Sequence, residues 1–269
     1  MKYVDGKTIW ITGASSGIGR ELALQLNKKG CKLILSARNE KALQKVRNEC
    51  GSTNTIAILP LDLEDFGSTQ QKVSEALSFF GTIDILINNA GISQRSLIID
   101  TDFEVYRKLV DVNYLGTVAL SKAMLPHFVA SKKGHFVVVS SLMGKFGALP
   151  RSGYCGSKHA LHGFFDVLRM EHEKDNVSVT MICPGFVQTD IAKNALTKDG
   201  TPQGTDDVEN NNGLPVAVFA KKMINAIEKQ KFEAYMGGKE VMGVYVKRFF
   251  PKLLHRMVIK SQTDKIKRS

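Results

Sequence analysis

Three residue types that together suit proton transfer fall in one short stretch of the chain: Ser141, Tyr154 and Lys158. The apolar run at residues 136–139 predicts a buried strand that ends near Ser141. Tyr154 and Lys158 are four residues apart, so on a following helix they lie one turn apart on one face. The serine can then hydrogen-bond a carbonyl oxygen, the phenol can give or take its proton, and the ammonium can stabilise a phenolate. A cation about 4 Å away at an effective dielectric of about 20 contributes roughly 4 kcal/mol, enough to lower a tyrosine pKa substantially.

A Tyr-x-x-x-Lys pair alone is weak evidence. The chain contains a second such pair, Tyr3 and Lys7, with no plausible chemistry nearby. The interpretation of Tyr154 and Lys158 therefore depends on the elements that would position them.

Length and composition indicate an ordinary globular chain. Its 269 residues, 43% of them hydrophobic, suit one large α/β domain or two small ones. The sequence contains no run of about 18 apolar residues, so we expect no segment that spans a bilayer. We also expect no signal peptide, because the first strand follows the N-terminus closely. The four cysteines are scattered, which predicts neither a disulfide framework nor a metal site. We expect a reducing, cytoplasmic compartment.

The net charge of +11 is concentrated at the C-terminal end. Residues 239–269 carry nine Lys or Arg and two acids, whereas the preceding 238 residues carry 28 and 24, so no nucleic-acid partner is indicated. Apolar residues at helical spacing and basic residues on another side predict an amphipathic segment over 241–259, which Pro251 must kink or restart. This extension could pack on the domain or on a second subunit, or make a peripheral membrane contact through residues 240–262.

A glycine-rich turn follows the first predicted strand. Residues 8–12 are β-branched or aromatic, and residues 20–29 have helical apolar spacing, so the intervening glycines occupy a strand-to-helix turn. Glycine lets the main chain approach a pyrophosphate, which the amino end of a helix stabilises. The predicted cofactor-binding residues here are Gly13, Ser15, Ser16, Gly17, Ile18 and Gly19.

The ends of the next strands indicate which dinucleotide binds. After the strand at 32–37, Arg38 stands where an acid would hold a free ribose hydroxyl. A guanidinium can instead hold a 2′-phosphate, so we predict NADP(H) over NAD(H). Asp62 and Leu63 follow the strand at 55–61 and would contact the adenine. Asn89, Ala90 and Gly91 follow the strand at 83–87 and would lie against the ribose.

The remaining elements complete a doubly wound sheet. A long helix over 103–122 carries Asn113 in its middle, either as a core asparagine that bridges helices or as a catalytic residue. A sixth strand at 177–182 leads to Pro184, which turns the chain toward the cofactor together with Gly185, Val187 and Thr189. A helix over 216–228 and an edge strand at 232–236 follow. The pattern predicts one Rossmann-fold α/β domain over residues 1–238, with about seven strands and helices on both faces, and the extension 239–269.

Residues 191–214 differ from the rest of the domain. They are rich in polar residues, Gly and Asn, with little to bury. We expect a mobile loop over the substrate mouth, the alternative being a disordered insertion.

Taken together, these features resemble the classical short-chain dehydrogenase/reductase family over roughly residues 6–238. The motifs keep the family's order and spacing: Thr12-Gly-Ala-Ser-Ser-Gly-Ile-Gly19, Asn88-Asn-Ala-Gly91, Asn113, Ser141, Tyr154-x-x-x-Lys158, and Pro184-Gly185 with Thr189. The resemblance implies that Tyr154 is the general acid/base and that Ser141 orients the carbonyl. Lys158 would hold the nicotinamide ribose and lower the tyrosine pKa. Asn113 would support a proton-relay water, and Thr189 would meet the carboxamide.

Within the family, residues 35–39, 140–145 and 163–169 are most similar to the 11β-hydroxysteroid dehydrogenase type 1 branch and its dehydrogenase/reductase relatives. That branch often has an N-terminal membrane anchor, which we do not expect here. Ser16 stands where NADP-preferring members often carry a basic residue, so the NADP prediction rests on Arg38.

We therefore expect an NADP(H)-dependent oxidoreductase acting on a hydrophobic ketone or secondary alcohol, steroid-like or lipid-like. Phe146, Leu149, Phe186 and the aromatic C-terminal tail are candidate pocket walls. A second hypothesis is a reductase of 3-oxoacyl thioesters, and a third is a non-catalytic NADP(H)-binding sensor or scaffold. The resemblance also implies a homodimer or homotetramer.

Overall fold

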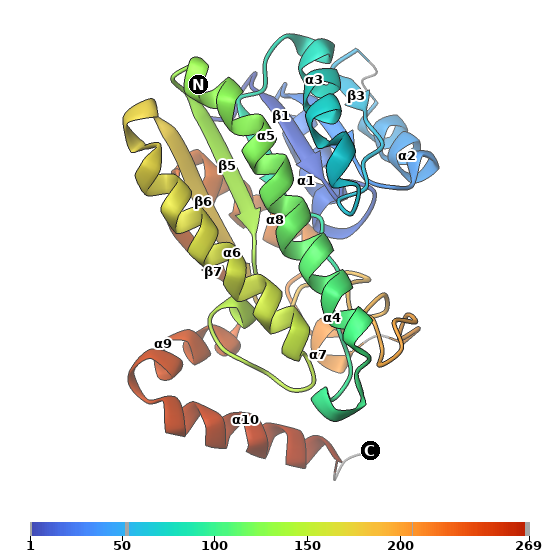
Figure 1. Cartoon of the computed structure of the whole chain (residues 1–269), viewed down its shortest axis with the longest axis vertical. Coiled ribbons are helices and arrows are strands. Elements are labelled where there is room, and N and C mark those ends of the chain that lie inside the picture. Colours follow the sequence, from blue (N-terminus) through green and yellow to red (C-terminus); the bar gives the residue numbers. More distant parts are fainter. Residues whose placement is uncertain (1, 52–53, 206, 267–269) are drawn as a thin grey trace.

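The structure, a computed structural model, describes residues 2–51, 54–205 and 207–266, with backbone only for 262–266. Seven parallel strands form one sheet in the order β3-β2-β1-β4-β5-β6-β7 (Figure 1). The strands are β1 Thr8–Thr12, β2 Lys32–Ser36, β3 Ile56–Ile58, β4 Ile85–Asn88, β5 Gly134–Val139, β6 Val177–Pro184 and β7 Glu233–Met236. The predicted doubly wound α/β class is confirmed.

Helices cover both faces of this sheet. One layer contains α1 (Gly17–Asn27), α2 (Glu40–Cys50) and α8 (Val216–Glu228). The other contains α3 (Thr69–Phe80), α5 (Gly116–Ala130) and α6 (Ser152–Glu171), with α4 (Phe103–Val110) beside α6. Along β1, Ile9 and Ile11 pack in the first layer and Trp10 in the second, as side chains that alternate along a strand must. The shorter helical turns are η1 Phe66–Ser68, η2 Ile98–Asp100, η4 Leu142–Gly144, η5 Glu173–Asp175 and η6 Lys239–Val241.

The strand order reverses between β1 and β4. Strand β1 leads outward to β2 and β3, whereas β4 begins the run to β7. Such a switch point opens a crevice at the carboxyl ends of the strands. The turn into α1, the end of β4 and the end of β5 all meet there.

The helix predicted over 103–122 is longer and is interrupted. Its start at Phe103 is as predicted, but α4 passes into a π turn, η3 (Asp111–Leu115), and then into α5, which ends at Ala130. Asn113 is the buried residue of the π turn. A π turn inserts an extra residue and redirects side chains, and such turns are frequent at functional sites.

Residues 191–214 bury more than we expected. Ala192, Ala195, Leu196 and Asn210 are buried, and a short helix, α7 (Val208–Asn211), lies within the segment. The Asn210 amide donates to the Thr189 carbonyl at 2.6 Å. The prediction that this segment has little to bury was wrong, because three of these four buried residues are small or polar and only Leu196 is a large apolar side chain. Residue 206 lies outside the described part.

The C-terminal extension forms two helices below the carboxyl end of the sheet, α9 (Met242–Phe249) and α10 (Pro251–Ile266) (Figure 1). Pro251 restarts the helix, since proline suits the first helical position. Of the described side chains in α10, Leu254 alone is buried, whereas Leu253 and Met257 are about half exposed (48% and 51%). The division at residue 238 stays a prediction, and residues 267–269 of the predicted extension are outside the described residues.

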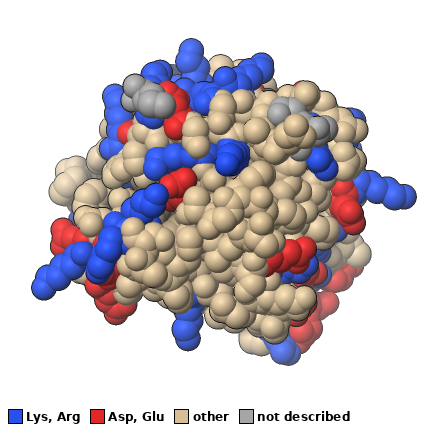
Figure 2. Space-filling model, turned by 90° about the horizontal axis from the view of Figure 1, so that it is seen from above, with Lys and Arg blue, Asp and Glu red and all other residues tan. Residues whose placement is uncertain are grey.

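Charges of both signs are spread over the surface. The face in Figure 2 carries basic and acidic side chains around a broad area of other residues. Among the described residues, none of the helices combines the length and apolar character needed to cross a bilayer.

Candidate active site

A cleft of about 690 Å³ lies at the carboxyl ends of the central strands. Its volume is in the range of ligand sites, about 300–1,000 Å³. Most predicted site residues line it: Gly13, Ser15, Ser16, Gly17, Ile18, Arg38, Asp62, Leu63, Asn89, Ala90, Gly91, Ser141, Tyr154, Lys158, Pro184, Gly185, Val187 and Thr189. Gly19 and Asn113 are absent from this lining.

The glycine-rich turn is held in shape by Asn89. Its side-chain amide donates to the carbonyl oxygens of Thr12 at 2.9 Å and Gly13 at 3.2 Å. Gly13 has a φ of 65°, and a Cβ there would lie 2.8 Å from the Ala90 Cα. Gly19 lies beneath the turn, where a Cβ would lie 2.7 Å from the Asn89 amide nitrogen. Gly19 serves close packing of α1 on the turn, and its contact with the cofactor stays a prediction.

The residues of this half of the cleft fit a dinucleotide. The first turn of α1 contains no acid, and the side chain of its N-cap, Ser16, does not cap the helix. The amino end of α1 therefore offers backbone N–H groups and a positive dipole end to a phosphate. Arg38 is exposed on the same cleft, and the described residues give it no ion pair. Asp62 lines the same cleft and directly follows Leu61, whose N–H donates to the Ala37 carbonyl at 3.2 Å.

Ser141, Tyr154 and Lys158 converge on the other half of the cleft. All three are buried, with relative exposures of 7%, 8% and 4%. The Ser141 side chain lies close enough to the Tyr154 phenol to lower its pKa. The lysine ammonium lies 5.9 Å from the centroid of the tyrosine ring and donates to the Val139 carbonyl at 2.8 Å. The predicted placement of phenol and ammonium on one face of a helix is therefore found.

Burial dominates the electrostatics of this group. It raises the pKa of Tyr154, against the opposing influence of the Ser141 hydrogen bond and of the positive charges on Arg151 and Arg95. It lowers the pKa of Lys158 to about 8. We expected the lysine to lower the tyrosine pKa. In this structure the Lys158 ammonium donates a hydrogen bond to the Val139 carbonyl. The positive charges of Arg151 and Arg95 instead favour the phenolate form of Tyr154.

Asn113 lies behind the cleft and ties three segments together. Its Oδ1 accepts from the Ile92 N–H at 2.8 Å, and its Nδ2 donates to the Ile92 carbonyl at 2.9 Å and the Ser157 hydroxyl at 3.0 Å. A Cβ on Gly91 would lie 3.0 Å from Oδ1 and 3.3 Å from the Lys158 Nζ. The asparagine therefore fixes the chain after β4 against α6 at Ser157, the residue that precedes the lysine.

Two groups that position the site were not predicted. Gln94 Oε1 accepts from the N–H of Gly153 at 2.7 Å and of Tyr154 at 3.3 Å, which holds the first turn of α6. Asp207 Oδ2 accepts from Arg95 at 2.6 Å and from Arg151 at 3.0 Å. No local sequence pattern indicates either, since each joins residues far apart in the chain. The ion pairs tie the 191–214 segment to the start of α6.

The pocket walls that we predicted lie elsewhere. Phe146 is buried against the α9 residue Gly243, and Phe186 lies under the Arg151 guanidinium, 5.9 Å from its ring centroid. Leu149 lines a separate groove of about 480 Å³ beside α10. The apolar part of the cleft wall instead includes Ile191 and Leu196 of the 191–214 segment. Apolar type and proximity in sequence were insufficient to choose these residues.

Comparison with known proteins agrees with this arrangement. A family profile described as short chain dehydrogenase matches residues 7–200. Dehydrogenase/reductase SDR family member 7B of Mus musculus is 40% identical over 262 residues, which cover 95% of this chain and 81% of that protein. Dehydrogenase/reductase SDR family member 7 of Homo sapiens is 49% identical over 199 residues, 72% of this chain and 59% of that protein. A short chain dehydrogenase/reductase from Burkholderia phymatum, solved in complex with NAD, superimposes with a TM-score of 0.83 at 23% identity, covering 94% and 96% of the two chains.

Proposed function

The chain belongs to the short-chain dehydrogenase family, and from this premise we propose that it is an NADP(H)-dependent oxidoreductase acting on a hydrophobic ketone or secondary alcohol. One observation carries the proposal. The buried Ser141, Tyr154 and Lys158 line the same cleft as the glycine-rich turn at Gly13 and Gly17. A nicotinamide cofactor, when bound, supplies or accepts the hydride.

The protein residues handle the proton and the position of the substrate. The Tyr154 phenol donates its proton to a carbonyl oxygen during reduction and takes it back during oxidation. The Ser141 hydroxyl donates a hydrogen bond to that oxygen and holds the substrate carbon in place. The Lys158 ammonium would hold the nicotinamide ribose, while the charges of Arg151 and Arg95 favour the phenolate. Asn113 holds the backbone at Ile92 by a hydrogen bond, and this keeps Gly91 close to the Lys158 ammonium.

Preference for NADP(H) is supported by Arg38. It is exposed on the cleft beside Ala37, and no acid occupies the first residues after β2. A guanidinium attracts a 2′-phosphate that a carboxylate would repel. The NAD complex among the structural neighbours belongs to a protein 23% identical and leaves this preference open.

The test of the proposal is a comparison of kcat/KM with NADPH and NADH over a panel of steroidal, aliphatic and aromatic ketones and 3-oxoacyl thioesters. We expect free ketones to be reduced with NADPH, and Arg38→Asp to reduce the preference for NADPH. Equal or better kcat/KM with NADH in the wild type would contradict the cofactor assignment. Turnover of thioesters alone, with free ketones inert, would contradict the substrate class.

A peripheral membrane contact through α9 and α10 is a second part of the proposal. Phe249 and Phe250 are 70% and 63% exposed, and Lys252 and Arg256 lie on the same extension. Exposed apolar side chains beside basic ones suit an anionic lipid surface. Co-sedimentation with anionic vesicles should fall in a Phe249→Ser/Phe250→Ser variant. Equal co-sedimentation of variant and wild type would end this idea.

Self-association is supported by apolar side chains exposed on the α4 to α6 layer. Val110 and Leu115 are 38% and 39% exposed, and Val167 and Met170 on α6 are 47% and 69% exposed. We propose that these faces pair in a homodimer or homotetramer. Sedimentation velocity should give an oligomer that Met170→Glu weakens, and a monomeric wild type would refute it.

A further inference from the structure

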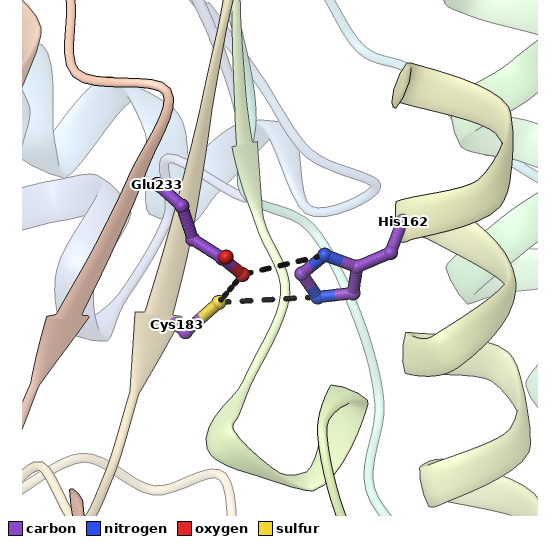
Figure 3. A group of neighbouring side chains, drawn as sticks. All are labelled: His162, Cys183 and Glu233. Atoms are coloured by element: carbon purple, nitrogen blue, oxygen red, sulfur yellow. Dashed lines mark hydrogen bonds and ion pairs between the residues drawn. The ribbon is translucent and has the colours of Figure 1, made fainter. Parts of the chain in front are cut away.

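Three side chains of metal-binding type meet behind the catalytic serine. His162 on α6, Cys183 on β6 and Glu233 on β7 point toward one another (Figure 3). Cys183 Sγ lies 3.4 Å from Glu233 Oε1 and 3.9 Å from His162 Nε2, and His162 Nδ1 lies 3.5 Å from the same carboxylate oxygen. The proton transfer described above uses none of them.

These separations are close to those of a tetrahedral site. Bonds of about 2.0–2.3 Å from Zn²⁺ to oxygen, nitrogen and sulfur place neighbouring ligand atoms roughly 3.3–3.7 Å apart. The imidazole presents the edge between its two nitrogens to the sulfur and the carboxylate (Figure 3), so a rotation of the ring would aim one nitrogen at an ion. A thiolate, an imidazole and a carboxylate together are a donor set for zinc-like cations rather than for magnesium or calcium.

In this structure the carboxylate of Glu233 forms an ion pair with Lys145. The Lys145 ammonium lies 2.7 Å from Glu233 Oε1, and both side chains are about one quarter exposed, so an ion has a path from solvent. The other carboxylate oxygen accepts from the Tyr235 hydroxyl at 2.9 Å, a contact that would orient it as a ligand. The sequence suggested no metal site because residues 162, 183 and 233 have no ligand spacing and meet only across two strands and a helix.

We propose that His162, Cys183 and Glu233 form a binding site for a zinc-class divalent cation, with water as the fourth ligand. Binding breaks the ion pair between Lys145 and Glu233, and the thiol proton leaves to solvent as the sulfur coordinates the ion. No electron is transferred.

The site is connected to the catalytic group through two short paths. Cys183 precedes Pro184, whose carbonyl accepts from the Ser141 hydroxyl at 3.5 Å. Ser140 Oγ lies 3.0 Å from His162 Nε2 and donates to the Lys158 carbonyl at 3.2 Å. An ion that draws Cys183 and His162 together would therefore shift the backbone on both sides of the site.

The experiment is a titration of the full chain with Co²⁺ under a non-chelating reductant, followed by the thiolate-to-cobalt charge-transfer absorption. We expect one equivalent to bind with this band present. Cys183→Ser should abolish the band, and His162→Gln should weaken cobalt binding at least about tenfold. Lys145→Gln should tighten binding by about two- to fivefold, because it removes a competing, partly exposed ion pair. The matched control is Cys50→Ser, a half-buried cysteine away from the cluster, which should titrate as the wild type.

Absence of the band in both the wild type and Lys145→Gln would overturn the proposal, as would a band that survives in Cys183→Ser or disappears in Cys50→Ser. Circular dichroism of each variant confirms that it is folded. The readout is absorption and needs no turnover. Failure of the oxidoreductase proposal would therefore leave this result intact, and the reverse also holds.

Discussion

The Lys158 ammonium donates a hydrogen bond to the Val139 carbonyl across the junction of α6 and β5, at 2.8 Å. The lysine is thereby held beside the phenol of Tyr154 in a buried position, where a positive charge is costly. This contact links the helix that carries Tyr154 to the strand that leads to Ser141. Catalytic function and stability should therefore oppose each other at this residue.

Lys158→Met should stabilise the protein at neutral pH while removing its activity. Burial lowers the lysine pKa from 10.5 to about 8, which corresponds to about 3 kcal/mol at about 1.4 kcal/mol per pH unit. In the variant the Val139 carbonyl loses this hydrogen bond, which offsets about 1–2 kcal/mol of the gain in the free energy of unfolding. Because the folded-state pKa lies below the unfolded one, the wild type's free energy of unfolding rises with pH between about 8 and 10.5. The advantage of the variant should therefore shrink across that window.

Urea unfolding of both proteins at several pH values measures this difference. The exposed Lys122 of α5 offers a matched control, since Lys122→Met removes a lysine that solvent already surrounds. A Lys158→Met protein less stable than the wild type at pH 7, or a difference independent of pH, would contradict the account.

Gly13→Ala should damage both fold and cofactor binding, whereas Gly6→Ala should damage only the fold. Both glycines have positive φ, 65° and 72°, where a side chain adds about 1–2 kcal/mol of strain. Only at Gly13 would the new Cβ also meet a backbone atom, the Ala90 Cα at 2.8 Å. We expect about 1–2 kcal/mol of destabilisation for Gly6→Ala and about 2–5 kcal/mol for Gly13→Ala.

Thermal unfolding and a fluorescence titration with NADPH separate the two effects. The Gly13 variant should bind NADPH at least about tenfold more weakly, a loss of about 1.4 kcal/mol. Equal NADPH affinity in the two variants would show that the turn does not approach the cofactor.

Arg151→Gln should move the pH dependence of alcohol oxidation upward. The Arg151 charge lowers the pKa of Tyr154 against the effect of burial. Oxidation needs the phenolate, so removal of the cation shifts the midpoint of kcat/KM to higher pH. Arg107→Gln on the exposed side of α4 is the control. An unchanged or lower midpoint in Arg151→Gln would refute this role.

The fold and the lining of the cleft followed from local patterns. Apolar runs predicted the strands, and the turn from β1 into α1 predicted where Gly13 and Gly17 would lie. Tyr154 and Lys158 were placed correctly because helical spacing alone fixes their shared face.

What escaped prediction depends on contacts between distant residues. Gln94 reaches α6 across 59 positions, and the carboxylate of Asp207 meets two arginines from other loops. The π turn at Asn113 leaves no signature, since its sequence reads as continuous helix. Phe146, Leu149 and Phe186 are absent from the lining of this cleft for the same reason. Which apolar residue faces the cleft is decided by the path of the 191–214 segment.

The most direct test of the central claim is NADPH oxidation with a reducible ketone, measured for the wild type and Tyr154→Phe side by side with NADPH affinity. The variant removes one hydroxyl from a buried ring and leaves the glycine-rich turn untouched. The account predicts that Tyr154→Phe binds NADPH like the wild type and loses turnover by about 10²-fold or more, the size of a general acid's contribution. Turnover retained in Tyr154→Phe, or a wild type that binds NADPH tightly and reduces no carbonyl compound, would contradict it.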